Sequence, residues 1–414
     1  MESPLPVTAR IAEGTLSVGG VSATALAAEF GTPLLVYCGE TLRAQARAYR
    51  ALDRDALVAY GTKAFANVAL LRLFATEGVG ADVSTLGELE FALRAGVPAD
   101  RIVFHGNNKS DAELAAAASH DILVVLDAEE EVERAASAGI RRALIRLTPG
   151  VEAETHRSIQ TAHSESKFGL DPDQALATAA AARAYLDLVG VHVHVGSQLT
   201  RIDASLAAVD RLVEFCTRAR EELGWRPEIV DLGGGLGVRH VRDEAVPDVV
   251  GFVGGVIRRF RDAWTEPARL ILEPGRSLVG RAGVTLYRVG ATKRSGGIDY
   301  AAVDGGMSDN PRPQLYAARY EPLLANRASG PVDGIFRIAG KHCESGDVLV
   351  DAAELPRPER GDLLAVPATG AYTLAMASTY NSVPRPAAVL VERGEAHLIR
   401  RRETVDDLLA YEIG

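Results

Sequence analysis

The chain has 414 residues, of which 47% are hydrophobic and 24% are charged, a composition typical of a globular protein and not of a disordered or fibrous one. At roughly 150 residues per domain, this length predicts two to three domains. The net charge of −10, from 45 Lys and Arg against 55 Asp and Glu, argues against nucleic acid or an anionic membrane surface as a partner. The longest basic run, Arg400 to Arg402, is too short to change that balance.

Cysteine usage and the N-terminal segment indicate a cellular location. The three cysteines, Cys38, Cys216 and Cys343, are odd in number and far apart, unlike the disulfide framework of a small secreted domain. The segment Met1 to Gly14 lacks the basic region and apolar stretch of a signal peptide. No apolar run reaches the ~18 residues that a membrane span needs. We therefore expect a cytoplasmic protein without a membrane segment.

Residues 55 to 275 alternate short apolar β-rich runs with segments of helical period, such as Leu86 to Ala95, which is the pattern of successive βα units. The predicted strands are Leu57 to Tyr60, Gly80 to Val83, Ile102 to His105, Ile122 to Leu126, Ala143 to Leu147, Val189 to Val195, Ile229 to Leu232 and Leu270 to Leu272. Eight βα units in this length predict a (β/α)₈ barrel of the TIM type, which typically takes about 250 residues.

The pattern of apolar and glycine residues changes after Pro274. Short apolar runs punctuated by glycine follow one another, and long helical stretches are few. The predicted strands of this part are Gly283 to Val289, Tyr300 to Val303, Gly334 to Ile338 and Ala387 to Val391. This pattern predicts an antiparallel β domain. Because no linker rich in Gly, Ser or Pro separates the two parts, we expect them to pack together.

The loops that follow the predicted barrel strands carry an unusual number of polar residues. In a barrel of parallel strands these loops meet at one end, where active sites lie. The residues concerned are Lys63, Asp82, Ser84, Glu88, His105, Lys109, Arg146, His194, Ser197, Gly233 to Gly237, Glu273, Gly275 and Arg276. A purely structural barrel does not require them, so we interpret this end as a functional site.

Several of these features together predict pyridoxal phosphate as a cofactor. Gly233 to Gly235 lack Cβ atoms, so backbone N–H groups can close on a phosphate, and Arg276 lies on the next loop. Lys63 offers an amine, and Glu273 offers a carboxylate that keeps a pyridine nitrogen protonated. Each feature alone has a structural alternative: glycine turns are common, lysines at a barrel mouth are usually solvated, and His194 fits a core histidine as well as a stacking partner.

Segments outside the predicted barrel leave two interpretations open. Lys341 to Asp347 concentrates a thiol and acids, but its neighbouring His, Cys and Glu side chains point apart, which excludes a zinc site formed by these three. Met307 to Tyr316 is a proline-braced loop that displays Arg312 and Tyr316. These two side chains fit either ordinary surface positions or a site for an anionic group.

In this order, the motifs resemble those of the fold-type III pyridoxal phosphate-dependent decarboxylases, over roughly Leu34 to Asn381. The matching stretches are Tyr60 to Asn67, His105 to Ser110, Ser166 to Gly169, His194 to Gln198, Gly233 to Gly237, Glu273 to Arg276, Arg312 to Tyr316, Cys343 to Asp347, Gly370 to Tyr372 and Tyr380 to Asn381. The resemblance implies an alanine racemase-like plan: an N-terminal segment, 1–37, that packs with the β domain, a cofactor-binding barrel over 38–280, and a β-rich domain over 281–414.

The resemblance also implies roles for individual residues. Lys63 would bind the cofactor covalently, His194 would stack on its pyridine ring, and Glu273 would pair with the ring nitrogen. Further cofactor contacts would be Asp82, Arg146, Ser197, Gly233, Gly234, Gly235, Gly275, Arg276 and Tyr372. The substrate would be bound by Arg276, Arg312, Tyr316, Glu344 and Tyr372. Cys343 would be a catalytic residue and the family's usual proton donor, and with Glu344 it would come from the second subunit of a homodimer.

Within this resemblance, Arg312 and Glu344 favour meso-2,6-diaminopimelate as substrate, which would be converted to L-lysine and CO₂ in the last step of lysine biosynthesis. One alternative is a decarboxylase of ornithine, lysine, arginine or carboxynorspermidine, whose cationic far end would meet an uncompensated arginine. An amino-acid racemase on the same plan would change chirality without releasing CO₂. A non-catalytic carrier of pyridoxal phosphate would not need the β domain.

Overall fold

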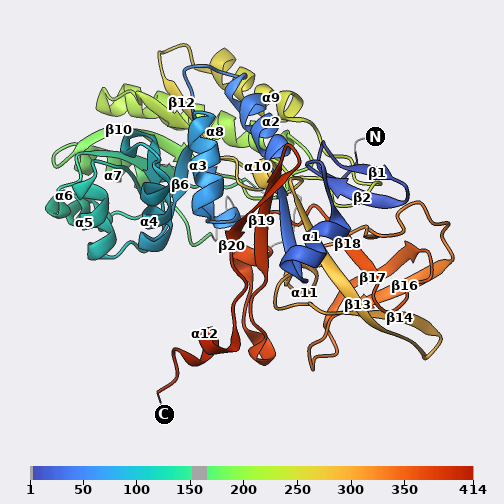
Figure 1. Ribbon diagram of the computed structural model, residues 1–414. Coiled ribbons are helices and arrows are strands. Elements are labelled where there is room, and N and C mark those ends of the chain that lie inside the picture. Colours follow the sequence, from blue (N-terminus) through green and yellow to red (C-terminus); the bar gives the residue numbers. More distant parts are fainter. Residues whose placement is uncertain (1–2, 152–165, 414) are drawn as a thin grey trace. The chain divides into compact units, whose positions relative to one another are not determined.

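A computed structural model describes residues 3–151 and 166–413, which belong to two compact units (Figure 1). The barrel unit consists of Gln45–Gly237 and Val246–Ser277, and the β unit consists of Met1–Ala44, Val238–Ala245 and Leu278–Gly414. Among the described residues, no helix is both long enough and apolar enough to cross a membrane.

The barrel unit contains a closed barrel of parallel strands, so the predicted (β/α)₈ barrel is confirmed. In order around the ring the strands are β5 (Leu57–Gly61), β6 (Gly80–Val83), β7 (Ile102–Phe104), β8 (Leu123–Leu126), β9 (Arg142–Leu147), β10 (Asp187–Val193), β11 (Ile229–Asp231) and β12 (Arg269–Leu272), and β12 pairs with β5. Each predicted strand agrees with the observed one to within two residues at either end. The strands are almost continuously apolar because interior side chains cover one face and helices cover the other.

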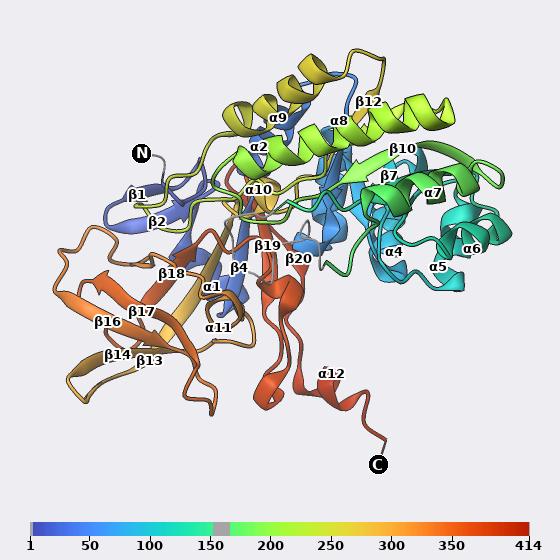
Figure 2. The ribbon, with the colours of Figure 1, turned by 180° about the vertical axis from the view of Figure 1, so that it is seen from behind.

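The helices between the strands form the outer layer of the barrel unit. They are α3 (Val68–Thr76), α4 (Leu86–Ala95), α5 (Asp111–Ser119), α6 (Glu131–Ala138), α7 (Pro172–Ala182), α8 (Asp203–Leu223) and α9 (Val249–Ala263). Reciprocal hydrogen bonds between Ser110 and Glu113 begin α5, and Asp171 and Gln174 begin α7 in the same way. The long helices α8 and α9 pack side by side (Figure 2).

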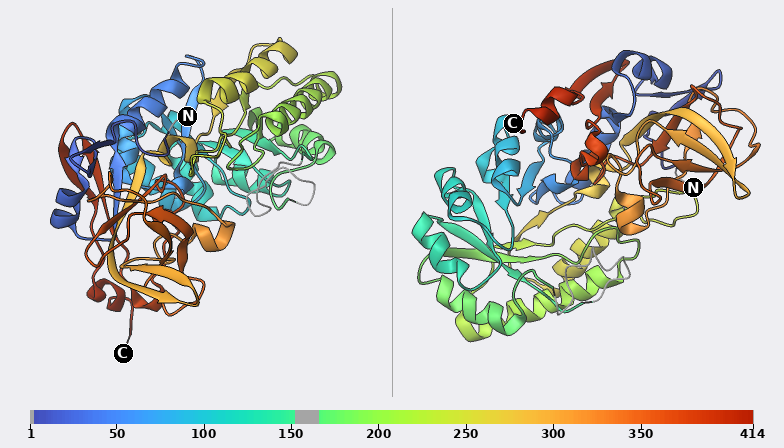
Figure 3. Two further views of the ribbon diagram at one scale, coloured as in Figure 1. Left: turned by 90° about the vertical axis from the view of Figure 1, so that its right-hand side faces the viewer. Right: turned by 90° about the horizontal axis from the view of Figure 1, so that it is seen from below.

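The β unit is built around a mixed sheet. Its elements are β1 (Arg10–Ala12), β2 (Thr15–Val18), β3 (Val21–Ser22), α1 (Ala23–Phe30), β4 (Leu34–Cys38), β13 (Gly283–Ser295), β14 (Ile298–Val303), α11 (Arg312–Tyr316), β15 (Leu323–Leu324), β16 (Gly334–Ala339), β17 (Val348–Leu355), β18 (Leu363–Pro367), β19 (Ala387–Glu392), β20 (Glu395–Arg400) and α12 (Val405–Leu409). The main sheet has the order β17-β16-β14-β13-β4-β19-β20, and α11, orange in Figure 3, packs against β17. Helix α2 (Gly39–Arg50) follows β4, and α10 (Arg276–Val279) precedes β13.

Most strand pairs of the β unit are antiparallel, as predicted, but two pairs differ. β14 pairs with β16 in parallel, and β19 pairs with β4 in parallel. Adjacent antiparallel strands need only a tight turn, whereas parallel neighbours need a long connection. The chain between β14 and β16 contains α11 and β15, and β4 comes from the other end of the sequence. Both parallel pairs join segments that are not neighbours in the chain, so the sequence pattern does not reveal them.

The N-terminal strand β4 lies in the centre of the β unit, between β13 and β19. Its side chains are fully buried, and Leu34, Val36 and Cys38 belong to one apolar cluster with residues of α1. Residues 238–245 also group with the β unit, whereas the sequence-based division placed them within a continuous barrel segment, 38–280. Hydrogen bonds and ion pairs to residues 319–321 attach this segment there.

Asp309 is a buried acid in the β unit whose ionisation opposes folding. Tyr287 donates a hydrogen bond to Asp309 Oδ2 (2.5 Å), and the Gly306 N–H donates to Oδ1 (2.8 Å). Burial nevertheless raises the pKa of Asp309 from 3.8 to about 7. The folded protein therefore binds this proton more tightly than the unfolded chain does. The resulting stabilisation is complete below the unfolded pKa and is lost as the pH rises through about 7.

We expect the free energy of unfolding to fall by about 2 to 3 kcal/mol between pH 5 and pH 8 because Asp309 ionises over this range. Asp309→Asn cannot ionise, so the melting temperature of the parent should fall relative to this variant over that pH range. Asp351→Asn, at a side chain that is 80% exposed, serves as the matched control and should follow the parent. Calorimetry at each pH decides the matter, and parallel curves for the parent and Asp309→Asn would refute the assignment.

Candidate active site

The polar residues predicted after the barrel strands do lie at one end of the barrel, because all eight strands run in the same direction. Lys63 follows β5, Asp82 lies in β6, and Arg146 lies in β9. His194 and the glycine loop follow β10 and β11, and Glu273 directly follows β12. The structure therefore brings together the site residues that were predicted from the barrel.

Glu273 is the centre of a buried hydrogen-bonding cluster. Its Oε1 lies 2.5 Å from Nε2 of His105, and its Oε2 lies 3.3 Å from Nε2 of His192. Burial by itself raises the pKa of Glu273, but the two histidines outweigh burial and hold this pKa well below the usual value. Burial lowers the pKa of His192 to about 3, so His192 is neutral. Glu273 is therefore an ionised carboxylate that hydrogen-bonds to His105 and lies close to the neutral ring of His192.

Asp231 is the fourth member of the cluster and takes the opposite charge state. Burial and the neighbouring carboxylate of Glu273 raise the pKa of Asp231 well above its usual value. Two acids at close range cannot both ionise in a buried site, so the pair keeps one proton. The proton resides on Asp231 and the negative charge on Glu273. The Gly233 N–H donates to Asp231 Oδ1 (2.8 Å), which fixes the orientation of this carboxyl group.

The same four side chains have the composition of a metal site. One ligand atom from each of His105, His192, Asp231 and Glu273 lies within 4.8 Å of the others. Two ligands bound at about 2.1 Å to one tetrahedral ion would lie about 3.4 Å apart. The 2.5 Å between His105 and Glu273 is instead a hydrogen-bond distance. We therefore interpret the cluster as a hydrogen-bonding network.

The three glycines after β11 permit close packing of the strand ends. A Cβ on Gly234 would lie 2.1 Å from the carbonyl oxygen of Glu273, and one on Gly233 would lie 2.5 Å from that of Val193. Gly235 has φ of +121° and lies against the Gly196 carbonyl. Any side chain at these positions would force the strand ends apart, so glycine is required here for packing as well as for its exposed backbone.

Hydrogen bonds within the loop reduce the number of N–H groups that remain available to an anion. The N–H groups of Gly233 and Gly234 donate to Asp231 and His194. The guanidinium of Arg276, which is 5% exposed, donates to the Ser197 hydroxyl (3.1 Å). An anion at this end of the barrel would thus meet chiefly Gly235, Ser197 and Arg276.

His194 is held as a neutral imidazole of one tautomer. The Gly234 N–H donates to Nδ1 (3.1 Å), so the ring proton resides on Nε2. Burial and the nearby Lys63 ammonium lower the pKa of His194 well below its usual value. The ring is nearly parallel to that of His192, with 6.5 Å between the centroids. A neutral ring in a fixed orientation suits stacking on an aromatic cofactor.

Lys63 places its amine at the open end of the barrel. Its side chain is 49% exposed, and Nζ lies 3.1 Å from Oδ2 of the buried Asp82. The Thr62 hydroxyl donates to the Asp82 carbonyl and ties the turn after β5 to β6. The amine is therefore both accessible and oriented by a carboxylate.

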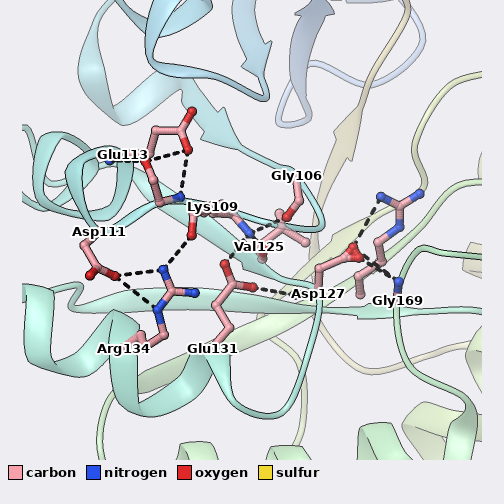
Figure 4. A network of polar contacts seen from close by, with 11 residues as sticks. Gly106, Lys109, Asp111, Glu113, Val125, Asp127, Glu131, Arg134 and Gly169 are labelled. Carbon is pink, nitrogen blue, oxygen red and sulfur yellow. Dashed lines mark hydrogen bonds and ion pairs between the residues drawn. The ribbon is translucent and has the colours of Figure 1, made fainter.

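Arg146 is attached to the barrel wall. Its guanidinium lies 3.9 Å from Asp127 Oδ2 and 4.4 Å from the centre of the Phe168 ring. Burial lowers the pKa of Arg146. Asp127 in turn accepts a hydrogen bond from the Gly169 N–H (2.6 Å), as Figure 4 shows. Contacts with Asp127 and Phe168 thus fix the position of the Arg146 guanidinium at the site.

A second buried network stabilises the loop after β7. The ammonium of Lys109, only 2% exposed, donates to the carbonyls of Gly106 and Val125 and to Glu131 Oε1 (2.7 Å), shown in Figure 4. Glu131 Oε2 accepts from the Asp127 N–H. Lys109 therefore fixes the loop that carries His105 and has a structural role.

The other predicted site residues belong to the β unit, where three loops meet. Ser308 hydrogen-bonds to His342 Nε2 (2.9 Å), and the Cys343 N–H donates to Asn381 Oδ1 (2.9 Å). The Tyr316 hydroxyl lies 3.9 Å from the sulfur of Met376. These contacts join the segments 307–316, 341–347 and 370–382, so the structure brings together the three regions that carry the predicted residues.

The predicted residues differ in exposure. Arg312 is 4% exposed, whereas Cys343 and Glu344 are exposed, and Glu344 Oε1 accepts from the Gly346 N–H. Tyr372 is half-buried and has φ of +59°, an uncommon conformation for a tyrosine. Gly275, half-buried, lies between Glu273 and Arg276 in the barrel unit.

Sequence reasoning did not assign His192 and Asp231 to the site. The signal was present for His192, because the sequence His-Val-His in a strand directs both histidines to the same face. Asp231 had no such signal, since an acid two residues before a glycine loop is a common turn feature. Its role depends on Glu273, which lies 42 residues further along the chain.

The donor set at the barrel end matches the chemistry of pyridoxal phosphate: an accessible amine, an anion cradle, a flat neutral imidazole and an ionised buried carboxylate. The family model of the pyridoxal-dependent decarboxylases, pyridoxal binding domain, matches residues 39–280. The fold and the site thus define a pyridoxal-dependent decarboxylase.

Full-length relatives specify the family further. The diaminopimelate decarboxylase of Bacillus subtilis is 41% identical over 422 residues, covering 97% of this chain and 95% of the relative. That of Actinosynnema pretiosum is 43% identical over 426 residues, covering 99% and 95%. The crystal structure of the M. jannaschii diaminopimelate decarboxylase with L-lysine superposes with a TM-score of 0.91 at 34% identity, covering 99% of this chain and 98% of that one. The chain belongs to the diaminopimelate decarboxylase family.

Proposed function

We propose that this chain decarboxylates meso-2,6-diaminopimelate to L-lysine and CO₂, the last step of lysine biosynthesis, with pyridoxal phosphate as cofactor. The observation that carries this proposal is the ionised Glu273, buried among neutral and positively polarised groups at the end of the barrel that also holds Lys63. A decarboxylase needs this carboxylate because a protonated pyridine ring accepts electrons far better than a neutral one.

The residues that would hold the cofactor are Lys63 at its aldehyde, Arg276 with Ser197 and the glycine loop at its phosphate, His194 at its ring and Glu273 at its ring nitrogen. When bound, pyridoxal phosphate supplies an electron sink for the pair released as the bond to the substrate carboxylate breaks. His105 and His192 stabilise the negative charge on Glu273, and Asp231 keeps the proton that the two acids share. The cluster therefore favours an ionised Glu273 for the ring nitrogen.

The remaining proposed roles concern protons and the substrate. Asp82 orients the Lys63 amine, which must lose its proton to bind the cofactor. We assign the proton that replaces CO₂ to Cys343, whose thiol is exposed and therefore accessible. Arg312, with Tyr316, Glu344 and Tyr372, binds the far end of the substrate, and Arg276 contributes near the phosphate. Arg146 supports the cofactor through the barrel wall.

We further propose a homodimer in the cytoplasm. The exposure of Cys343 and Glu344 in the β unit supports their being supplied to the site of a partner subunit. The three cysteines are free, and two are buried, which suits a reducing compartment. The domain division, with 1–37 joined to the β-rich part, is consistent with the position of β4.

The experiment that tests the function is incubation with meso-diaminopimelate, ornithine, lysine and arginine, with CO₂ and products measured by mass spectrometry. We expect equimolar CO₂ and lysine from diaminopimelate, and little turnover of the cationic amino acids, because their far ends would meet the Arg312 guanidinium. Change of chirality without CO₂ would indicate a racemase. Preference for ornithine or arginine would overturn the substrate and leave the cofactor assignment intact.

A further inference from the structure

Arg312 is a buried cation whose partners are all neutral. Its Nη1 donates to the Tyr320 hydroxyl (2.7 Å) and to His240 Nε2 (3.0 Å), and the guanidinium lies 5.7 Å from the centre of the Tyr320 ring. No carboxylate of the described residues forms an ion pair with Arg312, and its Nε has no hydrogen-bond partner among them. Burying an arginine without a counter-charge is costly. Such a guanidinium is poised to receive a carboxylate from a ligand.

The contact with His240 fixes the protonation of that imidazole. An arginine donates hydrogen bonds and accepts none, so His240 Nε2 must carry a lone pair. The ring proton therefore resides on Nδ1, which lies 3.7 Å from Oε2 of Glu244. Burial raises the pKa of Glu244, but the interactions with His240 outweigh burial and leave this pKa below its usual value. Glu244 is therefore ionised. The negative charge of Glu244 thus polarises a neutral ring whose lone pair points at Arg312.

His240 is itself held firmly. Its N–H donates to Glu244 Oε2 (2.6 Å), and its ring packs edge-on against Tyr320, with 5.6 Å between the centroids. Between His240 and Glu244 the segment is attached to residues 319–321: the Arg242 N–H donates to Glu321 (3.0 Å), and Asp243 pairs with Arg319. The imidazole is 4% exposed and has little freedom to move away from the guanidinium.

We propose that His240 is a positioning and specificity-determining residue: it orients Arg312 toward the far carboxylate of the substrate, and so favours diaminopimelate over amino acids that lack this group. The inference rests on the proposed function. Since a neutral acceptor orients the guanidinium without neutralising its charge, the full attraction remains available to the substrate. An acid in place of His240 would orient Arg312 equally well and would compete with the substrate.

The test compares His240→Phe, which keeps an aromatic ring against Tyr320 and removes the acceptor, with His240→Gln, which keeps an acceptor. For the holoenzyme we expect His240→Phe to raise KM for meso-diaminopimelate about 10- to 100-fold with kcat changed less than about 3-fold, because binding of the far end is lost equally in substrate and transition state. The inhibition constant of 1,5-diaminopentane, which has no carboxylate at its far end, should change less than about 3-fold. His240→Gln should restore most of the affinity.

The outcomes separate this inference from the proposed function. If the parent does not decarboxylate diaminopimelate, the proposed function fails. If the parent is active and His240→Phe keeps its KM, or weakens the binding of diaminopimelate and of 1,5-diaminopentane equally, the positioning role is wrong. His240→Met provides a second apolar variant if the phenylalanine variant does not fold. The same ratio, KM for diaminopimelate over the inhibition constant of 1,5-diaminopentane, then decides.

Discussion

Lys63→Ala is expected to abolish decarboxylation, with a loss of kcat of ~1,000-fold or more, because no other amine is assigned to bind the cofactor covalently. The parent protein should be yellow, and borohydride reduction should attach the cofactor to the peptide that contains Lys63. The half-exposed amine beside Asp82 makes this lysine accessible to the cofactor aldehyde. Lys109→Ala is an unsuitable control because Lys109 is buried in a structural network. Lys293 is exposed, so Lys293→Ala serves as the control and should keep full activity. A label on any other lysine would refute the assignment.

The same inactive variant tests whether the site is shared between subunits. Lys63→Ala and Cys343→Ala proteins, each inactive alone, are mixed under conditions that exchange subunits. In a mixed dimer one of the two sites contains both the intact lysine and the intact cysteine, so part of the activity should return. If subunit exchange is demonstrated and the mixture stays inactive, each site is built within one chain.

Arg312→Ala is expected to lower kcat/KM for meso-diaminopimelate about 30- to 5,000-fold, since removing one partner of a buried charge pair costs about 2 to 5 kcal/mol. Arg312 is 4% exposed and has only neutral partners among the described residues, so the substrate carboxylate would be its counter-charge. The variant should lose less of any weak activity toward lysine, whose far end carries no carboxylate.

The control for this prediction is Arg294→Ala, in the same unit. The Arg294 side chain is 70% exposed and lies 3.7 Å from Asp299, so its removal should change kcat/KM less than about 2-fold. Cofactor absorbance should be unchanged in both variants. An Arg312→Ala enzyme that processed diaminopimelate as well as the parent would show that Arg312 does not select the substrate, even with the fold and cofactor correct.

The barrel was predictable from the sequence because its signals are local. Apolar strands and helical segments alternate with a regular period, and the polar residues that follow the strands must meet at one end of a parallel barrel. Lys63, the glycine loop, Glu273 and Arg276 could therefore be placed in one site from their order in the chain. The two parallel pairs of the β unit were not predictable in this way, since β4 and β19 lie about 350 residues apart.

The sequence by itself determined which chemical groups this protein places at the ends of its strands. Each strand and the residues that follow it can be recognised from a short stretch of sequence. Tertiary structure alone decided their charge states and partners. His105 and Glu273 are separated by 168 residues, yet their contact keeps Glu273 ionised and leaves the proton on Asp231. His240 meets Arg312 across 72 residues. Burial and distance set each pKa and each hydrogen bond, and both quantities arise only when the chain has folded.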